Sequence, residues 1–114
     1  YVDGPVEIGG SDQAFRPMEM LLMALAGCTS MDVLSILKKQ RQTVEHYAMD
    51  VEGVRADATP AVYTEITLSF QVRGAVDPKK LDEAIRLSAE KYCSVSAMLE
   101  RGGVKIHWRG SVEP

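Results

Sequence analysis

The sequence predicts an α+β fold, because helical and strand-like patterns follow one another along one short chain. Residues 18–42 are rich in Leu, Met and Ala, which favours a long helix. Residues 62–73 and 104–109 alternate apolar and polar side chains, which is typical of strands with one solvated face. The predicted order is helix, strand, strand, helix, strand. We expect the 114 residues to form a single domain over residues 1–114.

The first fifteen residues carry two turn-prone clusters, Gly4-Pro5 and Gly9-Gly10-Ser11-Asp12. Clusters of this kind mark loops rather than helices or strands. We therefore expect a loop here, and we expect the N-terminal strands of the domain to be absent from this chain.

The long helix has apolar residues on more than one face. Pro17 suits its first turn, and the basic run at residues 38–41 complements its C-terminal end. Residues 20–26 are apolar on every side, so this half of the helix must be covered all round. One chain has few strands to cover it, and we expect an obligate homodimer. The longest uncharged apolar run, residues 20–31, has 12 residues, whereas a membrane-spanning helix needs about 20, so no membrane contact is expected.

Two strand-like runs follow the helix and predict a hairpin. Residues 48–55 alternate loosely, with Gly53 as an expected bulge, and residues 56–60 form a turn. Residues 62–73 alternate more regularly. The face expected to be buried carries Ile66, Leu68, Phe70 and Val72.

A second helix is predicted from Asp77-Pro78, an N-cap followed by the proline favoured in a first turn. Gly102-Gly103 ends this helical region, and the last strand follows. The helix face expected to be buried, which polar Ser88 makes imperfect, carries Leu81, Ala84, Ile85, Ser88, Ala89 and Tyr92.

Composition excludes several classes of function. The formal charge of -3 and the pI near 5.3 argue against nucleic acid as a partner, because nucleic-acid binding relies on clustered Lys and Arg. The two cysteines, Cys28 and Cys93, are too few for a secreted disulfide framework, and no signal peptide is recognisable. We therefore expect a cytoplasmic protein in which any pairing of the two thiols is transient.

The cysteines allow more than one interpretation. Each alone is more often a small buried side chain than a reactive one. Together with His46 and His107 they would make a four-ligand set for zinc, but no ligand pair has the usual zinc spacing. Nothing places either imidazole near a thiol, so a Cys-His nucleophile is also unsupported. The sequence predicts neither a metal nor a cofactor.

Charged residues near Cys28 affect its reactivity. Asp32 lies one helical turn later and opposes thiolate formation if it faces the sulfur. Arg16 and Glu19 lie roughly 14 to 18 Å from Cys28 along the helix axis, at 1.5 Å per residue, so they cannot contact it within the helix. A partner chain or a loop must supply the cation that a reactive thiolate needs.

The helical segment at residues 16–37, with Gly27-Cys28-Thr29 inside it, and the later Tyr92-Cys93-Ser94-Val95-Ser96 together resemble the OsmC/Ohr family of thiol-dependent peroxidases. The match runs from about Gly4 to Trp108. The resemblance implies an OsmC-like, intertwined homodimer with long central helices packed on antiparallel sheets and active sites at the subunit interface. It also implies an antioxidant enzyme of the oxidative stress response that reduces organic hydroperoxides.

By the same resemblance Cys28 is the peroxidatic thiol and Cys93 the resolving one, and an external dithiol is the reductant. The sequence departs from the family in three places. Ser94 replaces the proline of the family motif Cys-Pro-x-Ser. Met18 stands where the family has Glu, and Glu19 points about 100 degrees away. The activating Arg of the family lies in an N-terminal segment outside this chain, and Arg16 is at a different place.

An alternative function remains open from the residues alone. Six methionines favour an adaptable apolar surface, which could hold a fatty or aromatic ligand beside an unreactive Cys28. This would be a non-catalytic binding protein.

Overall fold

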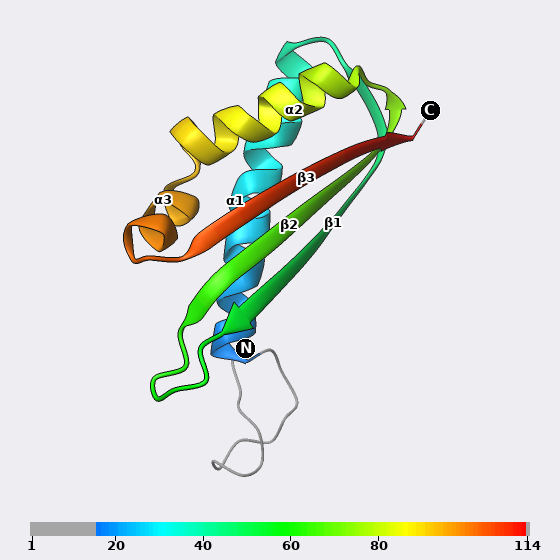
Figure 1. Ribbon diagram of the computed structural model, residues 1–114. Coiled ribbons are helices and arrows are strands. Elements are labelled where there is room, and N and C mark those ends of the chain that lie inside the picture. Colours follow the sequence, from blue (N-terminus) through cyan, green and yellow to red (C-terminus); the bar gives the residue numbers. More distant parts are fainter. Residues whose placement is uncertain (1–15, 114) are drawn as a thin grey trace.

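The fold consists of one long helix, a three-stranded sheet and a broken helical segment between the second and third strands (Figure 1). The computed structural model describes residues 16–113, so the loop expected over residues 1–15 lies outside them. The elements are α1 (Pro17–Lys39), β1 (Thr43–Arg55), β2 (Tyr63–Ala75), α2 (Pro78–Leu87), the π-helical turn η2 (Ser88–Tyr92), α3 (Ser94–Arg101) and β3 (Lys105–Glu113). The α+β class is confirmed.

The sheet has the strand order β1-β2-β3 and is mixed. β1 and β2 form the predicted antiparallel hairpin, whereas β3 runs parallel to β2. The resemblance implied antiparallel sheets, so the parallel pairing of β3 with β2 was not expected. A helical crossover joins β2 to β3, and a crossover of this kind returns the chain to the same end of the sheet.

α1 and α2 both pack on one face of the sheet. Gly53 of β1 pairs with Ile66 and faces Leu22 of α1, while Gly110 of β3 pairs with Phe70 and faces Ile85 of α2. The alternation predicted for β2 is confirmed on this face. The fully buried side chains of the core include Leu25, Val33, Leu37, Ile66, Leu68, Phe70, Leu81 and Ala84.

Several predicted boundaries were wrong by a few residues. α1 ends at Lys39 rather than at residue 42, because the chain turns at Arg41, which has a positive φ of 60°. β1 begins at Thr43 rather than at residue 48. Gly53 is not a bulge, since it pairs in register with Ile66. It is needed because a Cβ there would lie 2.5 Å from a ring carbon of Tyr63.

The second helical region is broken, although the sequence predicted it as continuous. It begins as predicted, with Asp77 Oδ1 accepting a hydrogen bond of 2.9 Å from Lys79 N. α2 then passes into the π-helical turn η2, and Cys93 is extended, with φ -78° and ψ 106°. Tyr92, expected on the buried face, is the last residue of η2 and is 51% exposed, whereas Cys93 directly after it is 3% exposed.

Among the described residues 16–113, α1 buries one stripe of side chains, Leu25, Thr29, Val33 and Leu37. Met23 and Met31 on its other side are 48% and 75% exposed. By length and composition α1 would suffice to cross a membrane, which the uncharged run in the sequence did not indicate. Its buried stripe packs into the core beside the sheet, as in the central helix of a globular domain.

Candidate functional site

The two cysteines lie side by side although they are 65 residues apart in the chain. Cys28 is in the middle of α1, and Cys93 lies at the break between η2 and α3. The thiol of Cys93 donates toward Cys28 Sγ over 3.1 Å, and neither cysteine is in a disulfide. Cys93 is 3% exposed, whereas Cys28 is half-buried. The pair therefore joins a half-buried cysteine to a buried one.

Cys93 is the N-cap of α3, not a residue near the end of a continuous helix as the sequence predicted. Its Sγ accepts a hydrogen bond of 3.3 Å from Ser96 N. Burial, reinforced by the bond to Cys28, raises the pKa of the Cys93 thiol to about 12, although the Ser96 N–H acts in the opposite direction. Near neutral pH Cys93 is thus a protonated donor.

Asp32 lies beside the two sulfurs. Its carboxylate oxygen and both Sγ atoms all lie within 4.8 Å of one another. Asp32 Oδ2 accepts a hydrogen bond of 3.0 Å from the hydroxyl of Ser88, which is fully buried. The backbone oxygen of Ser88 also accepts from Cys93 N over 2.9 Å. Ser88 therefore connects the carboxylate on α1 to the segment that carries Cys93.

Sequence reasoning missed the role of Ser88. The available signal was a polar residue inside an apolar helical stripe, because a buried hydroxyl needs a hydrogen-bond partner. The partner could not be found from spacing, since Asp32 and Ser88 are 56 residues apart.

The other residues considered from sequence do not join the site within residues 16–113. Arg16 and Glu19 lie at the start of α1, where Glu19 Oε1 accepts from Arg16 N over 3.4 Å. The unbroken helix keeps both about two to three turns from Cys28. His107 lies on the wet face of the sheet, with Nε2 3.6 Å from Glu65 Oε1. Neither His107 nor His46 belongs to the group of donors around the sulfurs.

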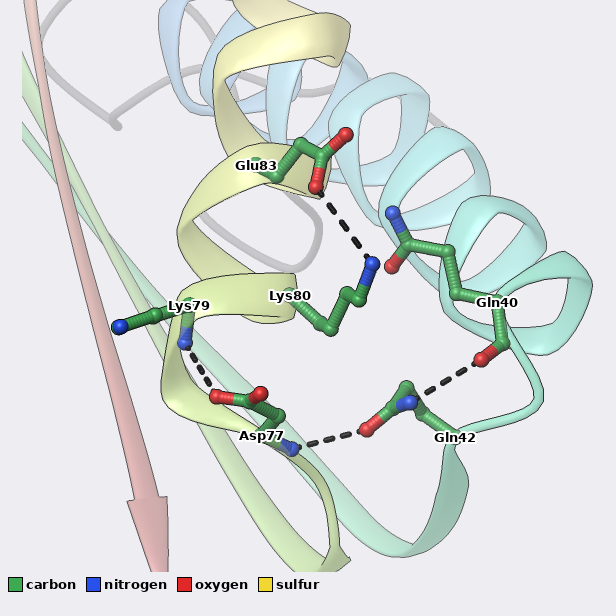
Figure 2. Close-up of polar contacts among 6 residues, drawn as sticks. All are labelled: Gln40, Gln42, Asp77, Lys79, Lys80 and Glu83. Atoms are coloured by element: carbon green, nitrogen blue, oxygen red, sulfur yellow. Dashed lines mark hydrogen bonds and ion pairs between the residues drawn. The ribbon is translucent and has the colours of Figure 1, made fainter.

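Polar contacts outside the site hold α1 against its neighbours. The hydroxyls of Ser30 and Tyr47 lie 2.5 Å apart and join α1 to β1. Figure 2 shows a second connection beyond the end of α1, where the Gln42 side chain accepts from Asp77 N over 2.8 Å and donates to Gln40 O over 3.0 Å. This bridge sets the start of α2 against the end of α1, and so helps to place the two segments that carry the cysteines.

A cavity of about 320 Å³ adjoins Asp32. It contains both apolar and charged side chains, and its lining is Asp32, Ser35, Ile36, Lys39, Leu87 and Tyr92.

Comparison of the sequence with known protein families shows which family this chain belongs to. Residues 10–109 match the family model described as OsmC-like protein. The chain belongs to the OsmC-like family. This OsmC-like protein is 45% identical to Protein YhfA of Escherichia coli K12 over 91 residues. The matched residues make up 79% of this chain and 68% of YhfA.

Solved structures share the OsmC-like fold. A hypothetical protein from Aquifex aeolicus VF5 is 38% identical, with a TM-score of 0.81 over 94% of this chain and 84% of that one. An organic hydroperoxide resistance protein OsmC from Legionella pneumophila is 20% identical, with a TM-score of 0.73 over 96% and 79% of the two chains. At that identity the likeness concerns the fold alone.

Two departures of this OsmC-like protein from the family pattern have a local structural reason, one at the helix break and one at the start of α1. Cys93 is the N-cap of α3 and Ser94 is its first residue, the position at which proline is favoured. Ser94 can take that place because any residue adopts the helical backbone there. Met18 packs against the core, and its backbone oxygen accepts a hydrogen bond of 2.7 Å from Tyr63. A carboxylate at that position would have to leave this apolar contact.

Proposed function

We propose that this protein reduces organic hydroperoxides, with Cys28 as the attacking thiol and Cys93 as the resolving thiol. The observation that carries the proposal is the Sγ–Sγ distance of 3.1 Å between two unpaired cysteines. Membership of the OsmC-like family supports it, as does the fold shared with an organic hydroperoxide resistance protein from Legionella pneumophila.

Burial favours this assignment of roles. The attacking sulfur has to meet the peroxide, and Cys28 is the more exposed of the two. The nucleophile is a thiolate, whereas the raised pKa of Cys93 keeps that thiol protonated near neutral pH. As a donor toward Cys28, the Cys93 thiol stabilises negative charge on the Cys28 sulfur.

The proposed chemistry has two steps. The Cys28 thiolate attacks one peroxide oxygen, so that an S–O bond forms, the O–O bond breaks, and the alkoxide leaves and takes up a proton to become an alcohol. Cys28 is then a sulfenic acid. The Cys93 sulfur attacks the Cys28 sulfur, an S–S bond forms, and the sulfenic hydroxyl leaves with a proton as water. An external dithiol reduces the disulfide by exchange and is itself oxidised.

We propose that the active form is a homodimer in a reducing compartment such as the cytoplasm. Met20, Met23 and Met31 form an apolar face of α1 that residues 16–113 leave exposed. A thiolate at Cys28 would lie close to the Asp32 carboxylate, and a nearby cation would offset the repulsion between the two negative charges. A second copy packed on α1 would cover the apolar face and could bring that cation to Cys28.

The roles are tested with cumene hydroperoxide and a reagent that traps sulfenic acids. We expect Cys28→Ser to lose peroxide-driven oxidation, and Cys93→Ser to consume one equivalent of peroxide and accumulate a trappable sulfenic acid at Cys28. Equal reactivity of the two variants would contradict the assignment, and so would trapping at Cys93 in Cys28→Ser.

A further inference from the structure

Three metal-ligating side chains converge at the break between η2 and α3. Cys28 Sγ, Cys93 Sγ and an oxygen of Asp32 all lie within 4.8 Å of one another. Two sulfurs and a carboxylate are donors that borderline-soft divalent cations accept, whereas Mg²⁺ and Ca²⁺ prefer oxygen alone. The donor set therefore has a metal preference of its own.

We propose that the reduced protein binds a thiophilic divalent cation, with Zn²⁺ as the best match, through Cys28, Cys93 and Asp32. The inference does not rest on the peroxidase proposal, because it requires only reduced thiols and the carboxylate beside them. Three protein ligands leave a fourth position of a tetrahedral site for water.

The distances fit after a small movement. Two thiolates on a tetrahedral Zn²⁺ lie roughly 3.8 Å apart, given Zn–S bonds of about 2.3 Å. The sulfurs are now 3.1 Å apart, so they would have to separate by about 0.7 Å. Cys28 is half-buried, so its side chain is less tightly enclosed than that of buried Cys93. Each thiol gives up its proton to the solvent as the metal–sulfur bond forms.

The surroundings orient the donors. Ser88 donates to Asp32 Oδ2 over 3.0 Å, and Ser96 N donates to Cys93 Sγ over 3.3 Å. Hydrogen bonds to ligating carboxylates and sulfurs fix their direction, and their loss commonly costs 10- to 100-fold in metal affinity. The carboxylate ligand and one of the two sulfur ligands therefore each accept a hydrogen bond that fixes their direction.

The site explains why sequence spacing offered no metal motif. Zinc motifs have ligand pairs a few residues apart, whereas Cys28 and Cys93 are brought together by packing between α1 and the broken helix. A disulfide between the same two sulfurs would remove two of the three donors. Metal binding and the disulfide are therefore mutually exclusive.

The test is competition for Zn²⁺ between the reduced full chain and a chromophoric chelator, with the protein kept in a phosphine reductant that does not bind zinc strongly. We expect one Zn²⁺ per chain, and we expect Mg²⁺ not to compete. Asp32→Asn should weaken binding by about tenfold or more and Ser88→Ala by about tenfold, while both thiols stay in place. Oxidation with diamide should abolish binding.

The matched control is His107→Asn, which removes an imidazole of the wet sheet face and should leave the affinity unchanged. If the reduced wild-type chain takes no Zn²⁺ from the chelator, the proposal is wrong. If Asp32→Asn and Ser88→Ala bind as tightly as the wild type, two thiols alone are responsible and the three-donor site is refuted. None of these measurements uses a peroxide, so the absence of zinc binding would not count against the proposed peroxidase activity.

Discussion

The hydroxyl of Ser88 donates a hydrogen bond of 3.0 Å to Oδ2 of Asp32. Ser88 is fully buried, and its backbone oxygen accepts from Cys93 N. This one residue therefore holds the carboxylate next to the sulfurs and at the same time closes the π-helical turn that leads to Cys93. Turns of this kind often occur at functional sites, because they change the direction of a helix at one position.

Ser88→Ala is predicted to destabilise the protein by about 1 to 2 kcal/mol, because a carboxylate oxygen loses a partner in a partly buried place. Urea unfolding of the reduced chain measures the effect. Ser35→Ala, at an exposed position on α1, is the control and should change stability by less than about 0.5 kcal/mol. Equal stability of Ser88→Ala and the wild type would show that the contact contributes nothing.

Gly53→Ala is predicted to cost about 1 to 3 kcal/mol of folding stability, because the new Cβ would lie 2.5 Å from a Tyr63 ring carbon. Thermal or urea unfolding tests this. Gly102→Ala is the matched control, since its nearest contact would be an ordinary 3.4 Å. If the two variants unfold alike, Tyr63 does not restrict this position.

Tyr47 gives a pH dependence whose sign can be worked out. Burial raises the pKa of Tyr47 above its ordinary value of 10, and the hydrogen bond with Ser30 only partly offsets this. The neutral phenol is thus favoured by folding. Its contribution to stability is fully present below pH 10 and is lost as the pH rises through the raised pKa.

Tyr47→Phe removes this titration. We expect the wild type to lose stability more steeply than Tyr47→Phe between pH 10 and 11, in unfolding experiments run at each pH. Tyr92→Phe, at an exposed site, should follow the wild type. Parallel curves for the wild type and Tyr47→Phe would contradict the assigned burial effect.

The sequence predicts well those helices and strands that are recognised from the spacing of neighbouring residues. Alternation placed Ile66 and Phe70 on the buried face of β2, and Asp77-Pro78 marked the start of α2. The parallel pairing of β3 and the break before Cys93 were missed. The first depends on how the crossover packs, and the second depends on a buried hydroxyl that finds its partner on another helix.

The candidate site was predicted in part. Resemblance named Cys28 and Cys93, and helical spacing placed Asp32 on the turn after Cys28. Their meeting point could not be predicted, because it requires α1 and the broken helix to pack with one particular register. Helical geometry also kept Arg16 and Glu19 away from Cys28, and the structure has the same unbroken helix between them.

The uncovered apolar face of α1 predicts an obligate homodimer. Met31 is 75% exposed and lies one turn from Cys28, so a second copy is expected to cover it. Light scattering at micromolar concentration should give twice the chain mass, and Met31→Lys should shift the protein toward the monomer by placing a charge in the contact. A folded wild-type monomer at that concentration would contradict this.

Cys28 and Cys93 are expected to act as one redox pair, and counting the free thiols after a single oxidation examines this pairing. Fully reduced protein is mixed with one equivalent of cumene hydroperoxide per chain in the absence of oxygen, its remaining thiols are counted, and its peptides are mapped by mass spectrometry. We expect the loss of two thiols per chain, a disulfide between the peptides that contain Cys28 and Cys93, and one equivalent of alcohol. Retention of both thiols would show that the pair does not reduce the peroxide, which is the result that the non-catalytic alternative expects. Loss of one thiol without that disulfide would show that Cys93 does not resolve the oxidised Cys28.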